Sequence, residues 1–206
     1  MNMALLGIFI PTFFFVSITP GMCMTMAMSL GMSIGYRRTL WMMVGEMIGV
    51  GLVAVAAVLG IASVMLNYPW LFTILKSVGA AYLFYLGIKM WQSKGKLALS
   101  DGNNQIQVGH NWNLVMQGFV TAIANPKGWA FMISLLPPFI ESSKPLAPQL
   151  TLLVAIILAF EFICMTIYAL GGKGLKSLLG HSKNVRLMNR ISGSLMMAVG
   201  LWLFLS

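Results

Sequence analysis

Charged residues are scarce in this chain. Only 8% of its 206 residues are charged, whereas 59% are hydrophobic, and the mean hydropathy is +0.87. A water-soluble domain of this size needs more polar surface, so the composition excludes a soluble globular protein. Short segments of alternating hydrophobicity, which barrel strands would show, are also missing. The long continuous apolar runs therefore predict an all-α integral membrane protein.

Acids, cysteines and histidines are scarcest, with 4, 2 and 2 copies. The sequence has no Cys-x-x-Cys pair, nucleophile motif or phosphate-binding loop, so we expect neither an enzyme nor a cofactor. One enzymatic alternative stays open, a thiol–disulfide relay through Cys23 and Cys164. Methionines at 22–32 raise a second alternative, a metal or other cation exporter. Because these methionines divide between opposite helix faces with no histidine nearby, we predict packing and no metal site.

Six apolar runs are long enough to cross a bilayer, which takes about 20 helical residues. No basic segment precedes the first run, so we expect an uncleaved span rather than a signal peptide. The predicted spans cover residues 4–30, 40–66, 71–91, 114–140, 150–170 and 187–205.

A polar segment divides these spans into two groups of three. Residues 93–113 are rich in Gly, Asn, Ser and Gln, and we interpret them as a cytoplasmic linker between residues 1–92 and 114–206. Since each group holds an odd number of spans, the second group must enter the membrane in the opposite orientation.

Two internal echoes support this division. Thr19-Pro20 in the first span matches Asn125-Pro126 in the fourth. Because these pairs lie in corresponding spans, they predict that spans one and four are interrupted at proline. Together with the second echo they predict two inverted three-helix repeats, an arrangement common among secondary transporters. The second echo sets Lys76, Gly79 and Gly87 in span three against Arg190, Gly193 and Gly200 in span six.

The net charge of +9 follows the topology and does not indicate a nucleic-acid partner. Most basic residues fall in alternate loops, so the positive-inside rule places these loops in the cytoplasm and both termini outside it. The expected partner of this surface is the lipid bilayer. The basic residues of the three loops are Arg37, Arg38, Lys89, Lys94, Lys96, Lys173, Lys176, Lys183, Arg186 and Arg190.

The two prolines should break their helices. Proline removes the hydrogen bond to the carbonyl four residues back, which would leave Val16 and Ala122 without a donor. Thr and Asn are good N-caps and proline suits the first helical position, so each pair should begin a new half-helix. The free N–H groups and the positive dipole end of this half-helix would face the membrane interior. A helix end of this kind binds a carboxylate well. The alternative is a pair of simple proline kinks.

Four ionisable residues lie within spans, where a charge at the bilayer centre costs at least about 2.5–3.5 kcal/mol. We expect Lys127 and Glu161 to approach each other, or to share a substrate's carboxylate and ammonium. Glu161 or Glu46 would carry a coupling proton. For Glu46 and Lys76 the alternative is that they reach the interface by snorkelling. In span two, Gly45 and Gly49 predict close helix packing.

With these motifs assembled, the chain resembles the LysE/RhtB family of bacterial amino-acid exporters. The matches are ITPG at 18–21, GAAYLFYLG at 79–87, ANPK at 124–127, and Glu161 followed by Tyr168. The resemblance implies export of amino acids from the cytoplasm, driven by the proton gradient. Members often carry a second proline where this chain has Met22, and many carry an Asp at the position of Val50.

We therefore predict an inner-membrane secondary transporter for amino acids or related small zwitterions. A homodimer stays open, because a glycine surface on span two or three would suit one. Proton coupling is assigned to Glu161 and Glu46, and accessory positions are Lys76, Tyr82 and Tyr168. The predicted substrate-binding residues are Thr19, Pro20, Gly21, Asn125, Pro126, Lys127 and Glu161.

Overall fold

A computed structural model describes the chain except residues 1–2, 68, 94–109, 137–138, 141–143 and 206. The described residues fold into helices, without a strand among them, which confirms the predicted all-α class. Most of the predicted linker lies outside the described residues. The helices are α1 Met3–Ile18, α2 Met22–Ile34, α3 Tyr36–Asn67, α4 Pro69–Gln92, α5 Asn111–Ile123, α6 Pro126–Leu135, α7 Leu146–Gly180 and α8 Ser182–Leu205.

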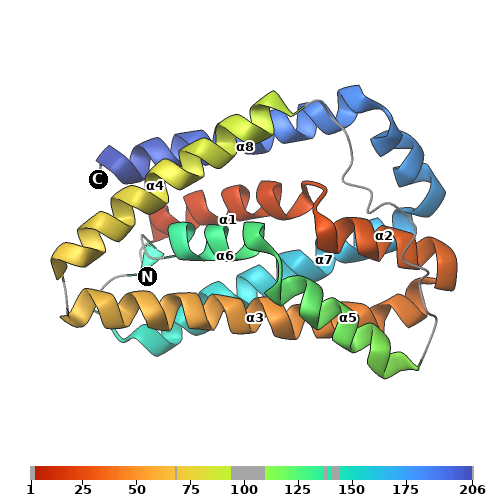
Figure 1. Cartoon of the computed structure of the whole chain (residues 1–206), viewed down its shortest axis with the longest axis horizontal. Coiled ribbons are helices and arrows are strands. Elements are labelled where there is room, and N and C mark those ends of the chain that lie inside the picture. Colours follow the sequence, from red (N-terminus) through yellow and green to blue (C-terminus); the bar gives the residue numbers. More distant parts are fainter. Residues whose placement is uncertain (1–2, 68, 94–109, 137–138, 141–143, 206) are drawn as a thin grey trace.

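The helices form an elongated bundle with two broken helix pairs (Figure 1). The short helices α1 and α6 lie in the middle, with α4 and α8 on one side and α3 and α7 on the other. The marked N and C ends lie together at one end of the bundle. The turn from α2 to α3 and the turn from α7 to α8 lie toward the opposite end, so the basic residues of these two turns are found there.

Two helices of the described part are long and apolar enough to cross a membrane by themselves. They are the α3 segment Tyr36–Gly60, with 25 residues, and the α7 segment Leu146–Gly172, with 27. The α1–α2 pair qualifies as a third span if it is counted as one broken helix. The six-span inverted repeat therefore stays a prediction.

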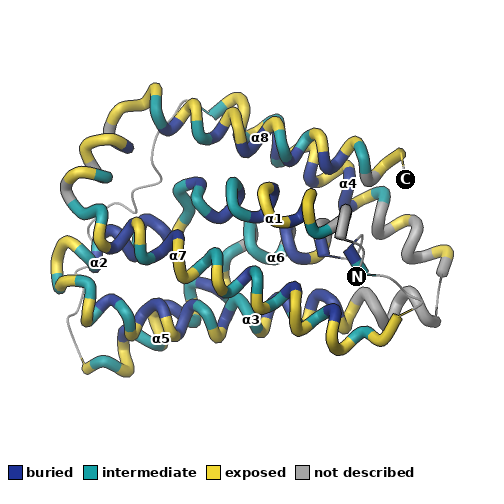
Figure 2. Tube along the Cα trace, turned by 180° about the vertical axis from the view of Figure 1, so that it is seen from behind, coloured by how far each residue is buried: buried dark blue, intermediate teal, exposed yellow. Residues whose placement is uncertain are grey.

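The outer surface of the bundle is apolar. Buried and exposed residues alternate along the outer helices (Figure 2). Large aliphatic side chains stand on the outside, among them Ile48 at 57%, Val78 at 60% and Leu170 at 62% exposure. Hydrocarbon is the natural surrounding for such a surface, as expected of a membrane protein.

Glycines let the helices approach at backbone contact. A Cβ added at Gly45 in α3 would overlap the Val115 carbonyl of α5, and a Cβ added at Gly49 would lie 2.7 Å from the Ala122 Cβ. The predicted close packing of span two is thus confirmed. In the same way, a Cβ added at Gly87 in α4 would lie 2.7 Å from the Gly193 carbonyl oxygen of α8.

Several helices extend beyond their predicted spans, α7 and α8 the most at a single end. Helix α7 continues past residue 170 to Gly180, with a bend at Gly172, where φ is 45° and ψ is −130°. Glycine tolerates a positive φ because it lacks a Cβ. Helix α8 begins at Ser182 rather than at 187. Hydropathy marks the apolar part of a helix and misses polar turns at its ends.

The core consists of two apolar clusters. One is rich in aromatic rings, including Phe13 and Phe131, whose ring centroids are 5.5 Å apart. The other is rich in methionine, including the fully buried Met28. Phe13 and Phe131 from the first cluster and Met24 from the second line one cavity, so the cavity lies where the clusters meet.

Candidate functional site

The first span is broken where the sequence predicts, but the break has a different cap. Helix α1 ends at Ile18, α2 begins at Met22, and the two are bent by 53°. The prediction that Thr19 caps the second half-helix is wrong, because the N-cap is Gly21 and no side chain caps it. The Thr19 hydroxyl instead donates to the Phe15 carbonyl at 2.7 Å. This back-bonding to the carbonyl four residues earlier keeps Thr19 on α1.

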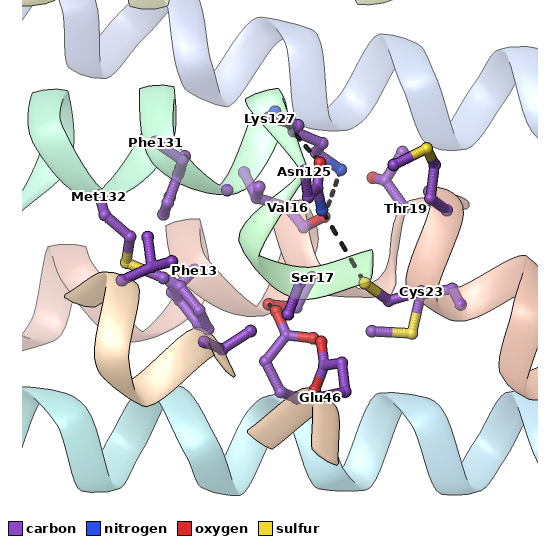
Figure 3. Close-up of a pocket in the computed structure, with 18 residues that line it drawn as sticks. Phe13, Val16, Ser17, Thr19, Cys23, Glu46, Asn125, Lys127, Phe131 and Met132 are labelled. Carbon is purple, nitrogen blue, oxygen red and sulfur yellow. Dashed lines mark hydrogen bonds between the residues drawn. The ribbon is translucent and has the colours of Figure 1, made fainter. Parts of the chain in front are cut away.

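Pro20 leaves the Val16 carbonyl without its helical donor, as expected. The Lys127 ammonium of α6 supplies the missing hydrogen bond at 3.1 Å. Figure 3 shows this contact as a dashed line between the two broken helices. Lys127, which follows the second break, therefore supplies the hydrogen-bond donor that the first break lacks. Its ammonium lies at the C-terminal end of α1, which is the negative end of the helix dipole.

Other carbonyls at the end of α1 are satisfied by helices that lie farther along the chain. The Ser192 hydroxyl of α8 lies within hydrogen-bond distance of the Phe15 carbonyl, at 2.8 Å, and of the Thr19 hydroxyl, and it donates its one hydrogen to one of them. The Tyr168 hydroxyl of α7 donates to the Ile18 carbonyl at 2.8 Å. Because an unpaired backbone group in hydrocarbon is costly, these contacts stabilise the break.

The second break has the predicted cap. Helix α5 ends at Ile123 and α6 begins at Pro126, with Asn125 as N-cap. The Asn125 side chain accepts a hydrogen bond from the Lys127 backbone N–H at 3.1 Å. The prediction that the Ala122 carbonyl lacks a hydrogen-bond donor is wrong, however, because this carbonyl accepts the Asn125 backbone N–H at 3.2 Å. A tight turn before the proline supplies this donor.

Both breaks border one partly open cavity of about 60 Å³ (Figure 3). Helices α1, α2, α3, α5, α6 and α7 all contribute to its lining. Apolar side chains form most of the wall, and the hydroxyls of Ser17 and Thr19 add two polar groups. The remaining polar residues of the lining are Cys23, Glu46, Asn125, Lys127 and Glu161.

Glu46 and Glu161 approach this cavity from different helices. Glu46, on α3, is 1% exposed, and its Oε2 atom has no hydrogen-bond partner among the described residues. In Figure 3 it extends from α3 toward Ser17. Glu161, on α7, accepts a hydrogen bond from the Ser17 hydroxyl at 2.9 Å. Both carboxyls line the cavity, which therefore holds an acid pair.

The expected approach of Lys127 and Glu161 takes an indirect form. The two residues line the same cavity. Within the described part of the chain, no ion pair joins them. Each instead contacts one of two consecutive α1 residues, Lys127 at the Val16 carbonyl and Glu161 at the Ser17 hydroxyl. The adjacent residues Val16 and Ser17 therefore position both side chains at the cavity.

Several predicted residues lie elsewhere. Pro20 lies at the first break without lining the cavity, the Pro126 side chain lies outside the described residues, and Tyr168 reaches the Ile18 carbonyl. Tyr82, on α4, is 40% exposed and packs beside Tyr85, away from the cavity. The Lys76 side chain lies outside the described residues. The structure thus brings together Thr19, Gly21, Asn125, Lys127, Glu161 and Glu46.

The sequence reasoning missed Ser17 and Ser192 in this region, and it considered Cys23 only for a thiol relay. Cys23 lines the cavity and receives the Asn125 side-chain N–H at 3.9 Å, whereas Cys164, also a free buried thiol, does not line it. Ser17 and Ser192 hold Glu161 and the end of α1. The available signal was a hydroxyl within an apolar run, because such groups need partners in a membrane.

The fold and the site together define a multi-pass helical membrane protein with a charged cavity at its helix breaks. Residues 13–206 match the family model of the LysE type translocators, and the chain belongs to this family. The predicted resemblance is therefore confirmed. Proteins of this family are transporters, so the chain is not an enzyme, and the thiol relay is set aside.

Similar proteins cover most of the chain. A homoserine/homoserine lactone efflux protein of Salmonella typhimurium is 28% identical over 184 residues, which cover 89% of this chain and 88% of that protein. A leucine efflux protein of Klebsiella pneumoniae is 24% identical over 159 residues, covering 77% and 74%. An uncharacterized membrane protein of Bacillus subtilis is 27% identical over 201 residues, covering 94% and 95%. No solved structure matches significantly.

Proposed function

We propose that this protein exports small amino acids or closely related zwitterions from the bacterial cytoplasm in exchange for protons. The observation that carries the proposal is the cavity, which brings two carboxyls and one ammonium to the breaks of two helices. Charged groups inside a membrane protein usually mark a substrate or ion pathway. The efflux of homoserine and leucine by two similar proteins favours the same class of substrate.

The carboxylate of the substrate would bind beside Lys127. An ammonium has three N–H donors, and the Val16 carbonyl takes one of them. The start of α2 adds backbone N–H groups that no side chain caps. A Cβ added at Gly21 would lie 3.9 Å from the Lys127 nitrogen, so the helix end and the ammonium are neighbours. Together they form an anion-binding position.

The ammonium of the substrate would bind at the acid pair. Glu46 offers an unpartnered carboxyl oxygen, and Glu161 is oriented by Ser17. A zwitterion would thus lie between Lys127 and the two acids. When no substrate is bound, a proton on Glu46 or Glu161 would take the place of the substrate's ammonium. Proton and substrate would then bind alternately at the same acid pair. This alternation is the basis of the proposed antiport.

The size of the cavity favours a small compound. One water takes roughly 10–15 Å³ of such volume, so about 60 Å³ accommodates only a few non-hydrogen atoms. Val50, Val53 and Ala122 form part of the apolar wall. A short aliphatic side chain would lie against them.

Six spans in two inverted repeats remain part of the proposal. The broken pair of each half packs on the long second helix of the other half, α5 on α3 and α2 on α7, while α4 packs on α8. This reciprocal pairing is expected of an inverted repeat. The basic loops at one end of the bundle would face the cytoplasm, with both termini outside it, in the inner membrane.

The test uses everted membrane vesicles with an acidic interior, in which an exporter carries substrate inward. Labelled amino acids are screened for uptake by vesicles with and without the protein. We expect uptake of at least one small amino acid, its collapse when the pH gradient is removed, and a loss of at least tenfold in Lys127→Ala and in Glu161→Gln. Wild-type uptake by both variants would refute the site.

A further inference from the structure

Exposed cations follow one face of α8 near its start. Lys183, Arg186 and Arg190 succeed one another at spacings of three and four residues, and all three are exposed. Side chains at such spacings are neighbours on the surface of a helix. Together they form the α8 basic row, and none of its members lines the cavity. The row is therefore separate from the transport site.

Within the described part of the chain, no carboxylate pairs with the α8 basic row. The sequence has four acidic residues. Glu46 and Glu161 line the cavity, whereas Asp101 and Glu141 lie outside the described residues. Because arginine and lysine side chains donate hydrogen bonds and accept none, the row is suited to an anion.

Helix α4 adds an aromatic ring to the row. The Arg190 guanidinium lies over the Trp91 ring, 4.8 Å from its centroid. The Asn189 side-chain N–H donates to the Ser93 hydroxyl at 3.0 Å, which ties the end of α4 to α8. Figure 1 shows the two helices side by side. The cation–π contact holds the guanidinium in place, and its five N–H donors are still able to bind an anion.

The row borders the apolar outer surface. Leu187 is 59% exposed and Trp91 is 45% exposed. The third predicted span ends at Trp91 and the sixth begins at Leu187, so both side chains fall where an interface of the bilayer is expected. Tryptophan is enriched at this depth, where head groups and acyl chains meet. An anion bound to the row would therefore have lipid as its neighbour.

We propose that the α8 basic row and Trp91 bind the phosphate group of an anionic phospholipid. Arg186 and Arg190 are one helical turn apart, so both guanidiniums can donate to one phosphate, a group that arginine binds in a bidentate manner. Lys183 adds a third positive charge. The acyl chains of the lipid would cover Leu187, which a soluble phosphate would leave exposed. Basic sites between membrane helices bind lipid head groups in this way.

The experiment measures lipid binding to the purified full-length protein in detergent by native mass spectrometry, which counts bound lipid molecules. The probes are phosphatidylglycerol, which has a net negative charge, and phosphatidylcholine, which has none. We expect the first phosphatidylglycerol to bind at least tenfold more tightly than phosphatidylcholine. Glycerol 3-phosphate, which has the phosphate without acyl chains, should not displace it at a tenfold excess over the lipid.

Two variants link this preference to the row. Arg186→Gln removes one phosphate donor, keeps the Arg190–Trp91 contact and should lower the preference at least fivefold, with an unfolding midpoint near wild type in the absence of lipid. Lys89→Gln is the matched control and should change the preference less than twofold. Lys89 is also an exposed cation beside a ring, 5.5 Å from the Tyr85 centroid, but it lies on α4 and outside the row. Each variant removes one positive charge, so net charge alone predicts equal effects.

Any of three results would overturn the inference. Equal affinity for the two lipids would show that the row does not select an anionic head group. An equal loss of preference in Arg186→Gln and Lys89→Gln would assign it to the diffuse positive charge of the surface. Displacement by glycerol 3-phosphate would make the row a site for a soluble anion.

Discussion

The Lys127 ammonium lies 3.1 Å from the Val16 carbonyl oxygen, the one that Pro20 deprives of its helical donor. Two proline breaks far apart in the sequence are thereby joined by one hydrogen bond. The bond places a cation at the end of α1, while the next residue, Ser17, holds Glu161. Two consecutive residues of α1 thus orient the charged groups that we assign to substrate binding.

This bond makes a stability prediction for Lys127→Met. The variant leaves the Val16 carbonyl unpaired, which should cost about 1–3 kcal/mol of unfolding free energy. Pro20→Ala in the same chain restores an N–H four residues after Val16 and should recover most of that loss without restoring transport. Unfolding in detergent and vesicle uptake measure the two effects. Equal recovery of stability and transport would contradict the role of Lys127 in binding.

A second prediction concerns the Tyr168 hydroxyl. Tyr168→Phe removes its 2.8 Å hydrogen bond to the Ile18 carbonyl and should destabilise the protein by about 1 kcal/mol. Tyr82→Phe is the matched control, because Tyr82 is 40% exposed and lies away from the cavity. It should leave stability and uptake within error of wild type. If the two variants lose equal stability, Tyr168 does not support the break.

A third prediction uses the two thiols. In a Cys164→Ser background, a small cationic methanethiosulfonate reagent should inactivate transport by modifying Cys23, because this thiol borders the cavity beside the acid pair. A saturating concentration of substrate should slow the reaction at least fivefold. Cys23→Ser should be resistant. Modification at the same rate with and without substrate would place Cys23 outside the transport site.

A fourth prediction separates packing glycines from neutral ones on α3. Gly45→Ala would force its Cβ into the Val115 carbonyl, so α3 and α5 must separate and stability should fall by at least about 2 kcal/mol. Gly60→Ala meets nothing within 4 Å and should be neutral or slightly stabilising, as Ala favours helix. Unfolding midpoints of the two variants give the comparison, and equal midpoints would refute the α3–α5 contact.

The sequence predicted the features that depend on local chemistry. Prolines inside apolar runs indicated both breaks, Asn125 was identified as a cap, and the rare charges pointed to Lys127, Glu161 and Glu46. The prediction for Thr19 was wrong because a threonine hydroxyl can either cap the next helix or bond the previous turn, and tertiary contacts decide between them.

Other features depend on how each helix is rotated about its axis. Cys23 faces the cavity because α2 packs on α7, and Ser192 reaches α1 because α8 packs on α4 through glycines. Neither rotation can be derived from hydropathy, since both residues lie in runs that are apolar on several sides. Ser17 was missed for the same reason.

The most direct test of the central claim is proton-driven amino-acid uptake by everted vesicles that carry wild-type protein, Glu46→Gln or Glu161→Gln. We predict that wild-type uptake follows the pH gradient. Each Gln variant should lose at least tenfold of the gradient-driven rate while its expression and unfolding midpoint stay near wild type. Gradient-driven uptake at the wild-type rate in both variants would contradict the claim that this acid pair exchanges protons for substrate.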